Sequence, residues 1–123
     1  MLIYIVDDND LIRATIRTII ELQGFSALDF ASAEEFLRKA RLEGASVLLL
    51  DVNMPGGMSG LDLVETLRAD GRVLPTIIMT VEWTEAVQRA VERAGARLLR
   101  KPFTPDELKH AIENTLHRPP SGD

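Results

Sequence analysis

The chain has 123 residues, a length that fits one domain with a single hydrophobic core. It contains no cysteine, which excludes a disulfide framework, a thiolate nucleophile and a cysteine-based metal site. Its formal net charge of -5 disfavours direct nucleic-acid binding, and its apolar runs are far shorter than the roughly 20 residues of a membrane span.

Short apolar runs in the first half of the chain predict strands that alternate with helices. Residues 2–6 predict a buried strand, and residues 9–10 then cap a helix that ends at Gly24. Residues 25–29 predict a shorter strand near a sheet edge, and residues 32–35 have capping-box spacing at the start of the next helix. The first helix has an apolar stripe wide enough to cover a sheet, made of Leu11, Ile12, Thr15, Ile16, Ile19 and Ile20.

The second half of the chain continues this alternation. The run Val-Leu-Leu-Leu at residues 47–50 predicts a strand buried on both faces, which ends on Asp51. A loop rich in proline and glycine follows, and Ser59 begins a helix that closes near Gly71. We then expect a strand at residues 74–80, a helix at 84–94, a strand at 96–100 and a helix at 104–116. Five alternations indicate an α/β fold with a doubly wound, five-stranded parallel sheet and helices on both faces.

Polar side chains follow four of these strands where each strand ends. They are Asp7 and Asp8, Asp51, Thr80 and Lys101. In a parallel sheet these ends lie at one edge, so the side chains share one crevice. Crowded carboxylates repel one another by roughly 4 kcal/mol per close pair, a cost that Mg²⁺ is suited to offset. An acid, a hard cation, a lysine and a hydroxyl together suggest phosphoryl transfer onto a carboxylate.

Taken one at a time, these residues have ordinary structural alternatives. The acids could cap helices or begin turns, the threonine could be a plain strand residue, and the lysine a solvated charge. Together these alternatives do not explain why all five residues follow the same ends of their strands. A transition-metal site is not expected, because the two histidines, His110 and His117, both lie in the last helix.

In this order and spacing, residues 7–8, Asp51, Thr80 and Lys101–Pro102 resemble the receiver domains of two-component response regulators. The likeness covers residues 2–116. Residues 30–37 and 54–61 look most similar to the nitrogen-fixation-regulator type, whose output domain usually binds DNA. The resemblance implies a flavodoxin-like sheet with strand order 2-1-3-4-5. It also implies a phosphorylation-driven switch rather than an enzyme acting on an external substrate.

The same resemblance implies a role for each motif residue. Asp51 is the expected phosphoacceptor for a sensor histidine kinase, and Lys101 and Thr80 are expected to contact the added phosphoryl group. Lys101–Pro102 is a cis peptide in the family. The implied cofactor is Mg²⁺, held by Asp51, Asp8, Asp7 through water, and the backbone carbonyl of Asn53.

Four further residues are expected to modulate the reaction, which are Asn53, Val81, Glu82 and Pro102. Asn53 and Glu82 lie two residues after Asp51 and Thr80, where the family tunes how fast water removes the phosphate. An amide and an acid there resemble the fast-cycling chemotaxis members. Val81 stands where the family usually has a smaller residue, so we expect it to narrow access to the site.

Three features depart from the family pattern. Residues 54–60 form a loop one residue longer than the commonest spacing, and its paired glycines can absorb the extra residue. The stretch from Gly95 to Lys101 is one residue short. The switch position of the fifth strand, aromatic in the family, is Leu98 when counted from Lys101 and Leu99 when counted from Gly95. The fifth strand therefore lacks the aromatic ring that the family couples to the threonine hydroxyl.

Domain organisation and partners also follow from the resemblance. We expect residues 1–117 to form a receiver domain, and residues 118–123 a tail or the start of a linker to a DNA-binding output domain. The domain is expected to act in the cytoplasm, without a membrane or nucleic-acid partner of its own. The face of the fourth helix, fifth strand and fifth helix is either a homodimer or partner surface or an ordinary solvated one. It carries Arg89, Arg93, Arg97 and Arg100.

Three rival functions remain open at this point. An aspartyl-nucleophile phosphatase needs an acid two residues after the nucleophile, where this chain has Asn53. A flavodoxin-like cofactor binder is disfavoured, because the acids would repel a flavin phosphate. A receiver that takes no phosphate and acts only as an interaction module fits the shifted loops but not the intact motif residues.

Overall fold

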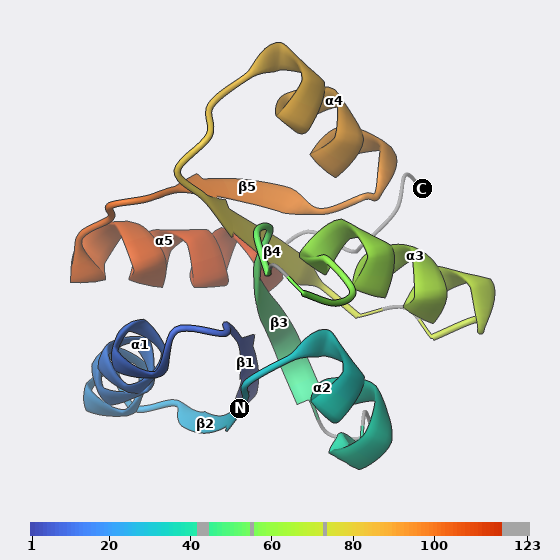
Figure 1. Cartoon of the computed structure of the whole chain (residues 1–123). Helices are drawn as coiled ribbons and strands as arrows, with labels where there is room; N and C mark the ends of the chain where they lie inside the picture. Colours follow the sequence, from blue (N-terminus) through green and yellow to red (C-terminus); the bar gives the residue numbers. More distant parts are fainter. Residues whose placement is uncertain (42–44, 55, 73, 117–123) are drawn as a thin grey trace.

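The computed structural model describes residues 1–41, 45–54, 56–72 and 74–116. Strands and helices alternate along this part of the chain (Figure 1). The strands are β1 (Leu2–Val6), β2 (Ser26–Phe30), β3 (Ala45–Asp51), β4 (Thr76–Thr80) and β5 (Arg97–Arg100). The helices are α1 (Asp10–Leu22), α2 (Ala33–Lys39), α3 (Gly60–Ala69), α4 (Glu85–Arg93) and α5 (Pro105–Leu116). Pro55 and the predicted tail, residues 118–123, lie outside the described residues, as does residue 117.

The five strands form one parallel sheet in the order β2-β1-β3-β4-β5, which confirms the predicted topology. Val6 is paired with Leu50, so the residues that follow β1 lie level with the end of β3. Thr80 is paired with Arg100, so β4 and β5 also end together. The register therefore delivers the predicted site residues to one edge of the sheet.

Both faces of the sheet are covered, which explains why the strands are apolar without a polar alternation. One hydrophobic cluster joins alternate strand residues, such as Ile3 and Ile5, to the inner faces of α1 and α5. The other joins Tyr4, Val6 and their neighbours to α2, α3 and α4. Figure 1 shows α1 and α5 on one side of the sheet and α2 and α3 on the other. The molecule is thus a three-layer sandwich, and its site residues lie at the carboxyl ends of the strands, beyond the two hydrophobic clusters.

The helix starts agree with the predicted capping residues. Asn9 accepts a hydrogen bond from the Ile12 N–H at 2.9 Å, which caps α1. Thr104 and Glu107 form a reciprocal capping box at α5, with bonds of 2.8 and 3.1 Å. Gly95 follows α4 with φ of 71°, the left-handed conformation that ends a helix and that glycine adopts without strain.

The predicted apolar stripe of α1 is correct only in part. Ile16 and Ile20 are buried, but Leu11 is 77% exposed and Ile12 is also exposed. Leu11 and Ile12 instead line a groove that opens between α1 and residues 101–103. Several strand ends also shift: β2, β4 and β5 begin one or two residues later than predicted. None of the helices in the described ranges has the length and apolar character needed to span a membrane.

Candidate functional site

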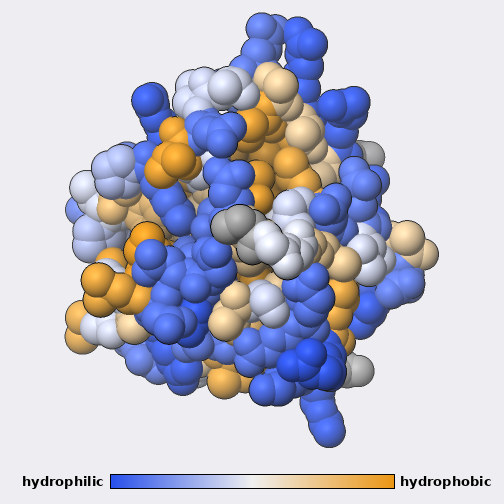
Figure 2. Space-filling view, in the orientation of Figure 1, coloured by the Kyte–Doolittle hydropathy of each residue, from blue (hydrophilic) through white to orange (hydrophobic). Residues whose placement is uncertain are grey.

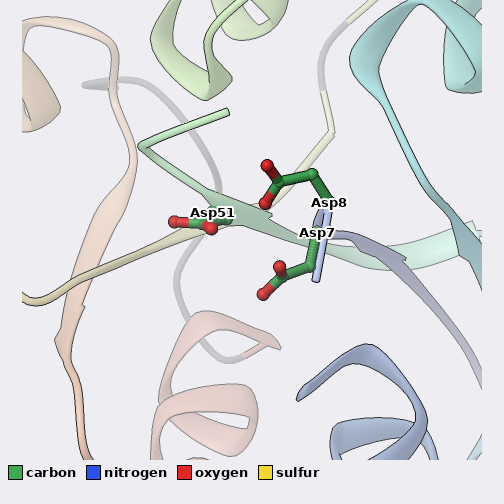
Figure 3. Close-up of side chains that lie close together, drawn as sticks. All are labelled: Asp7, Asp8 and Asp51. Carbon is green, nitrogen blue, oxygen red and sulfur yellow. The ribbon is translucent and has the colours of Figure 1, made fainter. Parts of the chain in front are cut away.

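Three carboxylates meet at the carboxyl edge of the sheet (Figure 3). Asp7 and Asp8 follow β1, and Asp51 is the last residue of β3. One carboxylate oxygen from each lies within 4.8 Å of the other two. Asp7 and Asp51 are buried, whereas Asp8 is exposed and forms the solvent side of the cluster. The sequence prediction that these acids share one site is confirmed in its geometry.

Lys101 supplies the positive charge of the site. Its Nζ lies 3.3 Å from Asp7 Oδ2 and 3.6 Å from Asp51 Oδ2. The residue directly follows β5, and its backbone N–H donates to the Thr80 carbonyl at 2.7 Å, which fixes it beside β4. The Lys101–Pro102 peptide is cis, as the resemblance implies. One ammonium thus faces a buried pair of carboxylates and offsets part of their repulsion.

The electrostatics of Asp51 favour a cation at this place. Burial raises the pKa of Asp51 above its ordinary value, and the charges of Asp7 and Asp8 raise it further. The ammonium of Lys101 and the Asn53 N–H, which donates to Asp51 Oδ1 at 3.1 Å, act in the opposite direction. Without an added positive charge, the ionised form of Asp51 is therefore held at a cost.

The donor set fits a hard divalent cation. Each of Asp7, Asp8 and Asp51 offers a carboxylate oxygen, and no nitrogen or sulfur ligand joins this cluster among the described residues. Such an oxygen-only set suits Mg²⁺, which binds one or two carboxylates together with waters and substrate oxygens. The described residues could therefore hold the predicted ion.

Thr80 and its neighbours line the other side of the site. Thr80 is buried, and its hydroxyl accepts a hydrogen bond from the Glu82 N–H at 2.9 Å and donates to the Glu82 carbonyl at 3.2 Å. The hydroxyl is thus engaged with its own loop. The Asn53 side-chain amide donates to Glu82 Oε1 at 3.3 Å, so the two predicted modulating residues touch each other. Val81, which is 65% exposed, lines a groove that also contains Lys101.

The two candidates for the switch position face opposite sides of the sheet. Leu98 packs on the α4 side, where it lines a cavity of about 190 Å³ together with Trp83 and Val91. Leu99 packs on the α5 side. The Arg100 guanidinium lies 5.7 Å from the centre of the Trp83 ring, within cation–π range. The role of Leu98 as a switch stays a prediction.

Two contacts of the site escaped the sequence analysis. Arg13 of α1 donates to the backbone carbonyl of Asp7 at 2.7 Å. Glu34 of α2 accepts from the Met58 N–H at 2.9 Å, which fixes the longer loop after β3 and lowers the pKa of Glu34. Two features of the sequence could have indicated these contacts. One is Arg13, an arginine in the first turn of the helix that follows the acids, and the other is Glu34, an acid in the capping sequence that begins at Ser32.

A hydrophobic groove of about 430 Å³ opens beside Lys101. It runs between α1 and the segment that joins β5 to α5. Figure 2 shows hydrophobic side chains at the surface over α1, although most of this view is hydrophilic. The α1 side of the groove contributes five residues, which are Leu11, Ile12, Thr15, Ile16 and Ile19. The opposite side contributes Val81, Lys101, Pro102 and Phe103.

A parallel sheet in this order, with three acids, a threonine and a lysine at its carboxyl edge, defines a CheY-like domain of the flavodoxin type. Residues 3–113 match the response regulator receiver domain, and the chain belongs to that family. This confirms the resemblance deduced from the sequence.

Three relatives show how far the likeness extends. Response regulator protein TodT of Pseudomonas putida is 33% identical over 119 residues, which are 96% of this chain and 52% of TodT. The DNA-binding transcriptional regulator NtrC of Proteus hauseri is 32% identical over 115 residues, 93% of this chain and 24% of NtrC. The chain thus spans about half the length of TodT and a quarter of NtrC. The structure of Vibrio cholerae chemotaxis protein CheY4 has a TM-score of 0.85 at 28% identity, covering 94% of this chain and 98% of CheY4.

Proposed function

We propose that this chain is a phosphorylation-activated switch that accepts a phosphoryl group on Asp51 from a sensor histidine kinase. The observation that carries the proposal is the position of Asp51, buried at a strand end with a lysine 3.6 Å away and two more carboxylates around it. The chain acts as a regulatory phosphoacceptor and not as an enzyme with an external substrate. A phosphatase is disfavoured, because Asn53 occupies the place of its second acid.

In the proposed reaction an Asp51 carboxylate oxygen attacks the phosphorus of the donor. An O–P bond forms while the P–N bond to the donor's imidazole breaks, and the imidazole nitrogen leaves with the electron pair of that bond. Lys101 is placed to pair with the phosphoryl oxygens. Mg²⁺ held by Asp7, Asp8, Asp51 and the Asn53 carbonyl would supply positive charge for the transferred group.

Thr80 provides the link from chemistry to conformation. Its hydroxyl accepts a hydrogen bond from the Glu82 N–H and donates one to the Glu82 carbonyl. It must break at least the bond it donates before it can donate to a phosphoryl oxygen on Asp51. The loop that carries Glu82 and Trp83 leads directly into α4. A change at Thr80 would therefore reach the face of α4, β5 and α5, with Leu98 at the switch position. The arginines of this face, Arg89, Arg93, Arg97 and Arg100, would serve a homodimer or an output partner.

The output proposed here is transcription, through a DNA-binding domain outside this chain. Support comes from NtrC, a DNA-binding transcriptional regulator of which the chain spans a quarter. Residues 1–117 would be the receiver unit, with residues 118–123 at the junction to the output domain. A histidine kinase as partner places the reaction in the cytoplasm.

The groove beside Lys101 is proposed as the place where the kinase docks. A donor that carries its phosphoryl group on a histidine must bring that side chain to Asp51, and its surface then covers the neighbouring groove. Leu11 and Val81 are exposed there, and covering such apolar area is favourable. Leu11→Ser should therefore slow transfer from a phosphorylated kinase but leave labelling by acetyl phosphate unchanged. Leu22→Ser is the matched control, since Leu22 is exposed on the same helix away from the groove lining.

The central experiment uses acetyl phosphate, Mg²⁺ and the mass of the intact protein. We expect a gain of one phosphoryl group, abolished in Asp51→Asn and by chelation of the metal. Asp70→Asn, which changes an exposed aspartate outside the cluster, should be labelled like the wild type. If the wild type gains no mass with a donor that labels other receivers, the chain is an interaction module and the proposal is wrong. Steady turnover of phosphate esters would favour the phosphatase.

A further inference from the structure

The turn between β1 and α1, which carries two of the three acids, is held from behind by Arg13. The Nη1 of Arg13 donates to the Asp7 carbonyl oxygen at 2.7 Å, and Nη2 donates to Asp10 Oδ1 at 2.7 Å. Its Nε donates to Asp29 Oδ1 at 3.2 Å. The side chain of Arg13 is 15% exposed, so the guanidinium is largely sequestered among these partners.

Asp29 anchors this arrangement to the sheet. It lies in β2, where it is paired with Ile5 of β1, and its second oxygen accepts from Arg17 Nη1 at 2.8 Å. A chain of hydrogen bonds therefore runs from β2 through Arg13 to the Asp7 carbonyl. Planar guanidinium groups hold fixed angles between their donors, so this connection restrains orientation as well as distance.

The bond to the Asp7 carbonyl acts on both acids. The carbonyl of Asp7 and the N and Cα of Asp8 lie in one peptide plane, so a restraint on the oxygen orients the start of Asp8. The Asp7 carboxylate is held separately, by the Asn9 N–H at 2.9 Å and by Lys101 at 3.3 Å. For Asp8, by contrast, no hydrogen bond of its own side chain is found among the described residues. Its aim toward the cluster depends on the backbone that Arg13 holds.

We propose that Arg13 is a positioning residue of the cation site, which sets the orientation of the Asp7–Asp8 peptide and thereby the affinity for Mg²⁺. This inference rests on the proposed function of the acid cluster. Arg13 does not contact the cation or the phosphoryl group. Its role is that of an outer partner that orients ligands, and loss of such partners typically weakens metal binding about 10- to 100-fold.

The hydrogen bonds that Arg13 donates do not depend on pH in the range where the carboxylates are ionised. Burial acts to lower the pKa of Arg13, but hydrogen bonds and charges from Asp10 and Asp29 outweigh it, and the pKa rises above its ordinary value. The guanidinium therefore stays protonated wherever the carboxylates are ionised.

Arg17 offers a matched control. It is the same residue type, lies one turn later on α1, and shares the partner Asp29. Its other hydrogen bond goes to Glu21, and no hydrogen bond among the described residues joins it to the turn that carries the acids. Removing Arg17 thus removes a similar charge and a similar salt bridge without touching the Asp7 carbonyl.

The test measures urea unfolding of the whole chain at increasing Mg²⁺ concentrations, for the wild type, Arg13→Ala, Arg13→Lys and Arg17→Ala. Stability without metal is read in EDTA, and affinity is read from how much Mg²⁺ is needed to raise the midpoint, since a ligand of the native state stabilises it by mass action. The Arg13→Ala curve should shift about 10- to 100-fold to higher Mg²⁺. Arg13→Lys should recover part of the loss, because an ammonium can reach the carbonyl but not Asp29 at the same time. Arg17→Ala should stay within about twofold of the wild type, as expected for a surface ion pair.

Each outcome decides the question. If Arg13→Ala is less stable in EDTA but binds Mg²⁺ like the wild type, Arg13 is only structural and the inference is overturned. An equal loss of Mg²⁺ affinity in Arg17→Ala overturns it as well. The loss would then come from removing a positive charge and not from losing the hydrogen bond to the Asp7 carbonyl. Should Arg13→Ala fail to fold, the comparison of Arg13→Lys with Arg17→Ala decides alone. A wild type that binds no Mg²⁺ and takes no phosphoryl group overturns the proposed function itself, which the mass experiment detects independently.

Discussion

Replacing Asp51 by asparagine is expected to stabilise the protein in the absence of metal. The variant removes two repulsions, toward Asp7 and Asp8, each at least about 3.5 kcal/mol at an effective dielectric of 20, because the oxygens lie within 4.8 Å of one another. It also removes one attraction of about 4.6 kcal/mol, to the Lys101 ammonium at 3.6 Å. The amide oxygen can still accept the Asn53 N–H. The two repulsions together exceed the attraction, so the free energy of unfolding should rise by about 2 kcal/mol at neutral pH.

The pH dependence of this gain has a definite sign. Burial and the neighbouring acids raise the folded-state pKa of Asp51 above the ordinary value of 3.8. Below 3.8 the carboxyl is neutral in both the folded and unfolded chain, so Asp51→Asn has no advantage there. As pH rises through the folded-state pKa, the wild type must hold a disfavoured charge and loses stability. The variant therefore gains its advantage between pH 3.8 and the folded-state pKa of Asp51, and keeps it at higher pH.

The assay is urea unfolding of both proteins in EDTA between acidic and neutral pH. Asp106→Asn is the control, because Asp106 is exposed in the first turn of α5 and its charge should help rather than harm. Saturating Mg²⁺ should reverse the order, since the wild type keeps all three carboxylates for the ion. An Asp51→Asn variant that is no more stable than the wild type in EDTA at neutral pH would refute this account of the acid cluster.

Four further outcomes are expected. Val81→Ala should speed labelling of Asp51 by acetyl phosphate, because a smaller side chain opens the mouth of the site; an unchanged or slower rate removes steric gating. Glu82→Ala frees the Asn53 amide and should slow spontaneous loss of the phosphoryl group, followed by intact mass over time; an unchanged rate contradicts the modulating role, and faster loss contradicts its direction. Trp83 fluorescence should change with Mg²⁺ and beryllofluoride, since its loop begins at Thr80 and its ring faces Arg100; a flat signal at saturation means this loop does not report the site. Gly60→Ala should lower the unfolding free energy by about 1–3 kcal/mol and slow labelling, because a Cβ would lie 2.5 Å from the Asp51 carbonyl oxygen; a wild-type urea midpoint would show that α3 shifts freely.

Most of the fold was predictable because its signals are local. Apolar runs such as residues 47–50 mark strands buried on both faces, and capping residues such as Thr104 mark the helix starts. The edge that carries the site follows from the rule that parallel strands end together. The predicted convergence of Asp7, Asp8, Asp51 and Lys101 is confirmed for this reason.

What escaped prediction depends on distances between elements. The exposure of Leu11 follows from the groove beside residues 101–103, which no helical periodicity encodes. The capping box predicted at residues 32–35 forms in part: the Ser32 hydroxyl accepts the Glu35 N–H, but the Glu35 carboxylate accepts from Ala31. The direction of the Thr80 hydroxyl is a rotamer choice, set by the loop around Glu82.

The hydrogen bond from Met58 to Glu34 bears on how this receiver can be recombined with its relatives. A Cβ at Gly57 would lie 2.8 Å from Glu34 Oε2, so a larger residue there would displace the exposed carboxylate and disturb its hydrogen bond with the Met58 N–H. If the β3–α3 connection alone were exchanged, α2 would keep Glu34 but lose the loop to which Glu34 is hydrogen-bonded. Chimeras of this domain should therefore carry α2 and that connection as one cassette.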